Sequence, residues 1–90
     1  MKSVFITGAA SGIGLATAQH FAAQGWFVGL YDINESGVTE LLQTAEFSNA
    51  YGSRCDVTDH SSVRSALEHF TKMTNGKIDV IINNAGVLSG

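Results

Sequence analysis

The chain has 90 residues and a formal net charge of −3, from five Lys and Arg against eight Asp and Glu. This length suffices for one small domain and excludes a multidomain protein, while 44% apolar and 14% charged residues exclude a disordered chain. The basic residues form no run, which excludes a nucleic-acid-binding surface of the usual basic kind.

The single cysteine and the hydropathy pattern indicate where in the cell the protein is located. Cys55 cannot form an internal disulfide, so nothing requires an oxidising environment. The apolar run at residues 4–6 is too short for the core of a signal peptide, and no run approaches the roughly 20 residues that span a bilayer. We expect a cytoplasmic protein with no membrane association.

The first predicted elements are a strand at residues 3–7 and a helix at residues 12–24. Gly25 follows the helix, and glycine is the residue type that commonly ends one. We expect four residues on the buried face of this helix: Ile13, Ala16, Thr17 and Phe21.

A second strand and helix follow. Residues 26–31 are apolar throughout, which is typical of a strand covered on both faces. Asn34 is a suitable N-cap for the next helix. Its buried stripe is expected at Val38, Leu41, Leu42 and Ala45.

The third strand is predicted at residues 50–55, and Asp59 is the expected cap of the third helix. Asn75 and Gly76 end that helix, and residues 78–82 form a fourth apolar strand. The buried stripe of the third helix is expected at Val63, Ala66, Leu67 and Phe70.

The order β-α-β-α-β-α-β with short connections predicts one α/β domain over residues 1–90. Right-handed crossovers place the first two helices on one face of a parallel sheet and the third on the other. The expected strand order is 3-2-1-4, which is half of a doubly wound, Rossmann-type sheet.

The segment TGAASGIG at residues 7–14 turns the first strand sharply into the first helix. Gly8 permits the turn, Gly12 lets the backbone approach a diphosphate, and Gly14 lets the helix pack close to the strand. The amides at the start of the helix then face the phosphates, and Ser11 adds a hydroxyl donor. Taken alone, the three glycines are equally well explained as an ordinary tight turn.

Asp32 ends the second strand, eighteen residues after Gly14. A carboxylate there accepts the hydroxyls of an adenine ribose and repels a 2′-phosphate. Neither Ser11 nor Ile33 is basic, so NAD is favoured over NADP. Taken alone, Asp32 is better explained as a solvated carboxylate at the end of a strand.

Two further segments follow the third and fourth strands. Asp56 is a candidate acceptor for the adenine amino group and Val57 a cover for the ring, although an acidic turn before a helix explains them equally well. Residues 83–86, NNAG, lie at the carboxyl end of the fourth strand, where open α/β sheets bind ligands. Asparagine also suits the backbone angles of such a turn.

With these four segments in order, the chain resembles the short-chain dehydrogenase/reductase family. The resemblance implies a dinucleotide-binding site in which Asn83 mainly steadies its strand. The cofactor-binding residues it implies are Gly8, Ser11, Gly12, Ile13, Gly14, Asp32, Ile33, Asp56, Val57, Asn84, Ala85 and Gly86.

The resemblance also implies hydride transfer between a nicotinamide and an alcohol or carbonyl, with a tyrosine as general acid/base and a lysine four residues later. Tyr31 is followed at that distance by Glu35 and Tyr51 by Cys55, so no catalytic residue is assigned. We expect the amino-terminal portion of a longer enzyme, inactive by itself. The alternative is a nucleotide-binding or interaction module without chemistry, or an inert remnant.

Other site types fit poorly. The glycine spacing matches neither a Walker-type phosphate loop nor a nucleophile elbow. His20, His60 and His69 lack metal-ligand spacing and are expected at helix surfaces or ends, and Cys55 is expected to be a packing residue. An apolar strand edge at residues 78–82 predicts a homo-oligomer.

Overall fold

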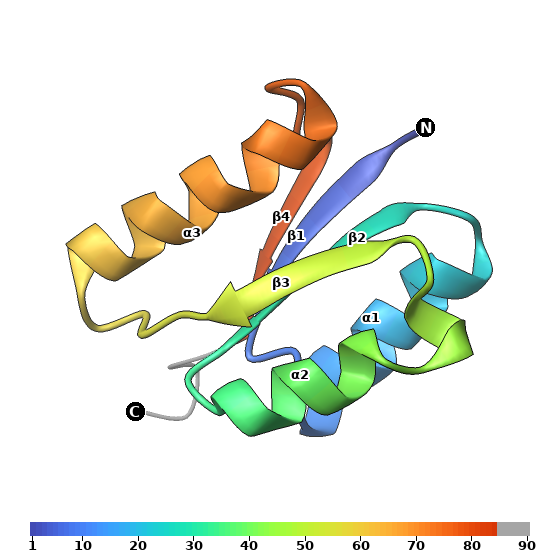
Figure 1. Cartoon of the computed structure of the whole chain (residues 1–90), viewed down its shortest axis with the longest axis horizontal. Helices are drawn as coiled ribbons and strands as arrows, with labels where there is room; N and C mark the ends of the chain where they lie inside the picture. Colours follow the sequence, from blue (N-terminus) through green and yellow to red (C-terminus); the bar gives the residue numbers. More distant parts are fainter. Residues whose placement is uncertain (85–90) are drawn as a thin grey trace.

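Four parallel strands form one sheet in the computed structural model, which describes residues 1–84 (Figure 1). The strand order β3-β2-β1-β4 confirms the prediction. In chain order the elements are β1 (Ser3–Thr7), α1 (Gly12–Ala23), β2 (Phe27–Asp32), α2 (Glu35–Leu42), η1 (Ala45–Phe47), β3 (Ala50–Arg54), α3 (His60–Thr74) and β4 (Val80–Asn83).

β1 lies between β2 and β4, and the register brings three strand ends to one level. Thr7 at the end of β1 pairs with Tyr31 of β2 on one side and with Asn83 of β4 on the other. The chain adds β2 and β3 on one side of β1 and then returns to add β4 on the other side. The carboxyl ends of β1 and β4 are therefore the switch point of the sheet.

Helices cover both faces, with α1 and α2 on one side of the sheet and α3 on the other, as right-handed crossovers require (Figure 1). The two faces have separate cores. The core under α1 and α2 is formed by the buried residues Val4, Ile6, Ala9, Ala18, Val28, Leu30, Val38 and Phe47. The core under α3 is formed by Phe5, Tyr31, Cys55, Ala66 and Phe70.

The predicted buried face of α1 is wrong at Ile13 and Ala16, which are exposed, although Phe21 packs partly buried against the core as predicted. Ile13 is 78% exposed, whereas Gly14 and Ala18 are the residues buried against the sheet. Apolar and small residues occupy nearly every side of this helix, so the sequence period did not distinguish its faces. Packing selects the side with the smallest residues, because these let the helix axis approach the strands closely.

Several boundaries also differ from the predictions. β2 begins one residue later than expected and includes Asp32, β3 ends before Cys55, and β4 starts at Val80 rather than at residue 78. Ala45 is exposed in a short 3-10 helix, and Phe47 at the end of that helix fills the core in its place. These differences lie at element ends, where local patterns are least specific.

The predicted helix ends are confirmed. The Asn34 side chain accepts a hydrogen bond from the Gly37 amide at the start of α2, and Asp59 accepts one from the Ser61 amide at the start of α3. Asn75 adopts the left-handed conformation that ends α3, with a φ of 60°. No helix within residues 1–84 has the length and apolar character needed to cross a membrane.

Candidate functional site

The glycine loop joins β1 to α1 through two left-handed residues. Gly8 has a φ of 68° and Gly12 a φ of 59°, a region that other residues rarely adopt. A Cβ atom on Gly14 would overlap the carbonyl oxygen of Gly8, so Gly14 allows α1 to touch the loop just after β1, whereas the predicted contact was with the strand itself. A Cβ on Gly12 would meet no atom within 4 Å, so its surroundings leave room for a ligand.

The first turn of α1 has no acidic side chain of its own to occupy its leading amides. Ser11 occupies the N-cap position with extended backbone angles, but its side chain makes no capping hydrogen bond within residues 1–84, and the first turn contains no acidic residue. The leading amides of a helix lack partners within it and carry a partial positive charge. Beside them, Ile13 projects into solvent. This turn can therefore hold an anion such as a diphosphate.

Asp32 stands at the carboxyl end of β2 and bonds to the glycine loop. Its Oδ2 accepts a hydrogen bond from the Ala10 amide at 2.9 Å, and its Oδ1 accepts one from the Asn34 amide at 2.9 Å. Ile33 is 58% exposed beside it and offers an apolar surface at the same edge. The structure thus brings the predicted acidic residue and the predicted phosphate loop together.

Arg54 is a cation that the sequence reasoning did not consider. It pairs with Asp32 in the register of β2 and β3. Within the described part of the chain, the two side chains form no ion pair within 4.0 Å. The pKa of the Asp56 carboxyl is lowered mainly by its hydrogen bonds with Thr58, and the positive charge of Arg54 lowers it further.

Asp56 follows β3 and is held in a turn. Its Oδ1 accepts hydrogen bonds from the Thr58 amide at 3.0 Å and from the Thr58 hydroxyl at 2.6 Å. These bonds lower the pKa of the Asp56 carboxyl, so this group stays ionised. Val57 packs partly buried against the core under α3. These contacts fit the turn before a helix, and they leave the adenine role a prediction.

The fourth segment lies beside the glycine loop. The Thr7 hydroxyl donates to Asn83 Oδ1 at 2.6 Å, which fits a steadying role for Asn83, and the Asn84 amide donates to the Thr7 carbonyl at 3.3 Å. Asn84 Nδ2 is buried and has no partner among the described residues. Thr7 was assigned no role from the sequence, although this residue begins the TGAASGIG segment; only the pairing of β1 with β4 places it opposite Asn83. The predicted residues Ala85 and Gly86 lie outside the described residues.

The other titratable groups do not join this site. His20 and His60 are exposed, as expected, but His69 is half-buried against β2 and β3, which corrects the prediction. Its Nδ1 lies 2.9 Å from the Tyr31 hydroxyl, and its ring stacks on Tyr51. No group of metal ligands occurs among residues 1–84.

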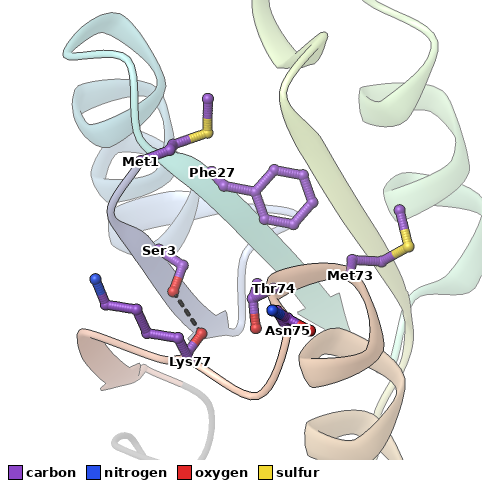
Figure 2. Close-up of a pocket in the computed structure, with 7 residues that line it drawn as sticks. All are labelled: Met1, Ser3, Phe27, Met73, Thr74, Asn75 and Lys77. Carbon is purple, nitrogen blue, oxygen red and sulfur yellow. Dashed lines mark hydrogen bonds between the residues drawn. The ribbon is translucent and has the colours of Figure 1, made fainter.

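A pocket of about 250 Å³ lies at the opposite end of the sheet, at the amino ends of β1 and β2 and the end of α3 (Figure 2). Its lining residues are Met1, Ser3, Phe27, Met73, Thr74, Asn75 and Lys77. Figure 2 shows the Ser3 hydroxyl donating to the Lys77 carbonyl, a bond of 2.8 Å that satisfies this polar group internally. None of the predicted cofactor-binding residues lines this pocket.

Comparison with known proteins gives consistent matches. The chain matches the model of the short chain dehydrogenase family over residues 2–90. Short-chain dehydrogenase reductase 5 of Arabidopsis thaliana is 39% identical over 87 residues, which covers 97% of this chain and 33% of that protein.

Solved structures agree with these matches. Actinorhodin polyketide ketoreductase with NADPH superposes with a TM-score of 0.83 at 32% identity, covering 94% of this chain and 33% of the other. The 3-ketoacyl-(acyl-carrier-protein) reductase from Brucella melitensis, complexed with NADH, gives a TM-score of 0.80 at 29% identity, covering 89% and 32%.

The fold and the site define a Rossmann-type nucleotide-binding domain. The chain belongs to the short chain dehydrogenase family, which is a family of oxidoreductases. It spans about a third of the length of the relatives that it matches.

Proposed function

We propose that this chain binds the adenosine and diphosphate part of a nicotinamide dinucleotide, and that the protein it belongs to transfers a hydride between that cofactor and an alcohol or carbonyl substrate. One observation carries the proposal: the phosphate loop and the sugar-binding carboxylate meet at one edge, through the bond of 2.9 Å from the Ala10 amide to Asp32. Solved relatives that hold NADPH and NADH support the class of cofactor.

The residues present fit such a ligand. The leading amides of α1 and the Ser11 hydroxyl would hold the phosphates, in the open space in front of Gly12. Asp32 would accept hydrogen bonds from the ribose hydroxyls. The buried Nδ2 of Asn84, which has no hydrogen-bond acceptor among the described residues, would be free to donate to the ligand. The bound dinucleotide itself supplies the hydride acceptor or donor.

We favour NAD over NADP because of charge. The carboxylate of Asp32 is fixed toward the glycine loop by two backbone amides, so a 2′-phosphate on the same ribose would meet a negative charge. Arg54 lies across from Asp32 but forms no ion pair with it within residues 1–84. Repulsion between two such charges about 4 Å apart amounts to about 1–4 kcal/mol, which corresponds to a preference of about fivefold to several hundredfold.

Calorimetric titration of the chain with NAD and NADP tests both statements. We expect NAD to bind about tenfold more tightly than NADP, and Asp32→Ser to reduce this ratio. Asp59→Ala is a matched control, because it removes an equal charge and an equivalent backbone-bonded carboxylate from the start of α3. Failure of both dinucleotides to bind would overturn the binding proposal, and tighter binding of NADP would overturn the preference.

Neither tyrosine of the chain is placed for proton transfer at this site. The Tyr31 side chain is fully buried on the α3 side and bonded to His69, and Tyr51 stacks on the same histidine. We therefore propose that the chain alone has no dehydrogenase turnover. A change in the absorbance of reduced cofactor with purified chain and substrate would contradict this.

The enzyme and the alternative of a binding module without chemistry differ in one feature of the parent protein. A Tyr-x-x-x-Lys segment after residue 90 in the parent reading frame favours the enzyme. A parent sequence without it favours the module. A parent protein that binds the dinucleotide without turnover would also identify the module.

The outer edge of β4 supports a homo-oligomer of the chain. Within residues 1–84, β4 has a strand neighbour on one side only, and Ile81 on its α3-facing side is 60% exposed. Unpaired apolar edges favour pairing with another chain. Light scattering should show a dimer or larger assembly that Ile81→Lys weakens, and a stable monomer at all concentrations would count against it.

The cytoplasmic location expected from the sequence remains a prediction. Fractionation of cells that produce the tagged protein tests it, and recovery in a membrane or secreted fraction would contradict it.

A further inference from the structure

Asp32 is bonded to three segments that follow three different strands. Its carboxylate accepts the Ala10 amide of the loop after β1 and the Asn34 amide at the start of α2. Its carbonyl accepts the Cys55 amide just after β3, at 2.9 Å. One residue therefore holds the carboxyl ends of β1, β2 and β3 in fixed positions relative to one another.

The glycine loop depends strongly on these bonds. Among the described residues, two hydrogen bonds connect the loop between Gly8 and Gly12 to another strand: Ala9 amide to the Tyr31 carbonyl at 3.2 Å, and Ala10 amide to the Asp32 carboxylate. The first is made between backbone groups and survives any side-chain change. The second depends on the side chain of Asp32 alone.

We propose that Asp32 is a positioning residue for the phosphate-binding loop, in addition to its expected contact with the sugar. This inference rests on the proposed function for its consequence in binding, but its structural part holds for the chain without a ligand. A carboxylate offers about four acceptor positions, so two amide bonds leave about two for ribose hydroxyls. The same group can therefore hold the loop and the sugar at once.

The proposal makes a prediction opposite in sign to simple electrostatics. Removing a negative charge near a bound anion should strengthen the binding of inorganic pyrophosphate, which has no sugar to contact Asp32. If Asp32 instead positions the loop, its removal should weaken pyrophosphate binding, because the loop amides lose the geometry that faces the phosphates. The two explanations are distinguished by the direction of one measured change.

The first experiment needs no ligand. In the isotopically labelled chain, hydrogen exchange of the Ala10 amide should become about tenfold faster in Asp32→Ala, since a hydrogen bond to a charged acceptor is lost. Asp59→Ala should leave the Ala10 amide unchanged and expose the Ser61 amide instead. Unchanged protection of Ala10 in Asp32→Ala would overturn the proposal.

If the Asp32→Ala variant does not fold, the same exchange experiment is carried out on Asp32→Asn. The asparagine side chain keeps the shape of aspartate but has one acceptor oxygen, so it can retain only one of the two amide bonds. Either the Ala10 amide or the Asn34 amide should then lose protection. Protection of both amides at the wild-type level would refute the positioning role.

The second experiment titrates the same labelled samples with inorganic pyrophosphate and with NAD, following the amide shifts of the loop. Weaker pyrophosphate binding in Asp32→Ala than in the wild type supports the proposal, and stronger binding overturns it. If neither compound shifts the wild-type spectrum, the proposed function fails. The positioning of the loop is then still decided by the exchange rate of the Ala10 amide.

Discussion

Substitution of Gly14 by alanine tests whether contact between α1 and the glycine loop fixes the site. A Cβ at this position would overlap the Gly8 carbonyl oxygen and lie 2.6 Å from its carbonyl carbon and 3.3 Å from the Cα of Ala9. All three are backbone atoms, so no side-chain rotation relieves the clash and α1 must move away from the loop. Overpacking of this kind costs about 1–3 kcal/mol, and more where the backbone cannot shift.

This loss of stability is a large part of the total for so small a chain. A total stability of about 5–13 kcal/mol is typical for ninety residues. A loss of 1 kcal/mol lowers the melting temperature by about 4–8 °C in a domain of this size, so Gly14→Ala should melt about 5–20 °C lower than the wild type. Displacement of α1 also moves its leading amides, and the affinity for NAD should fall at least tenfold in calorimetry.

Gly25→Ala is the matched control for this experiment. Gly25 has a φ of 84°, and a Cβ there would meet no atom within 4 Å. The substitution therefore costs about 1–2 kcal/mol of backbone strain without a clash, at the far end of α1. It should lower the melting temperature but leave NAD affinity unchanged. If Gly14→Ala melts like the wild type, or binds NAD as well as Gly25→Ala does, the contact between helix and loop does not fix the site.

Three other changes have expected outcomes. Burial and the charge of Lys72 keep the pKa of the His69 side chain below its ordinary value of 6.5. As the pH decreases, this side chain is therefore protonated at a higher pH in the unfolded chain than in the folded one. The free energy of unfolding should then fall as pH decreases from about 8 to 5. Urea titrations should give a flatter profile for His69→Gln, and identical profiles would contradict this. Phe70→Ala empties a fully buried site in the core under α3 and should cost about 3–5 kcal/mol in the same assay. Thr58→Val removes a hydrogen bond to Asp56, so the pKa of that carboxyl, followed by NMR, should rise; an unchanged value would assign its lowering to other groups.

Most of the fold could be predicted because its signals are local. Short apolar runs marked β1, β2 and β4 but not β3, which contains Gly52, Ser53 and Arg54. Stripes at helical spacing correctly marked the buried sides of α2 and α3, with Ala45 the exception. Their alternation is compatible with few topologies, because parallel strands need crossovers and crossovers are right-handed. Asn34, Asp59 and Asn75 act at helix ends through bonds or angles within a few residues, so they were also recognisable from the sequence.

In the candidate site, too, the local features could be predicted from the sequence and the contacts between distant segments could not. The glycine spacing predicted the sharp turn at Gly8 and the close packing at Gly14, since these depend on one turn of chain, but it did not predict the left-handed conformation of Gly12. The bond from Ala10 to Asp32 joins residues 22 positions apart, and nothing in the sequence separates it from a solvated carboxylate. Arg54 reaches the level of Asp32 only through the pairing of β2 with β3.

The sequence by itself determined the order of the elements, the parallel sheet and the position of a phosphate-binding turn, because periodicity and backbone preference act over a few residues. Tertiary structure alone decided which face of α1 is buried, since a helix that is apolar on most sides is oriented by the shape of its neighbour. It also decided that His69 bonds to Tyr31, 38 residues away, rather than remaining at the surface. Contacts of this kind arise only when the sheet brings distant segments together, and their strength depends on the exclusion of water from the place where they meet.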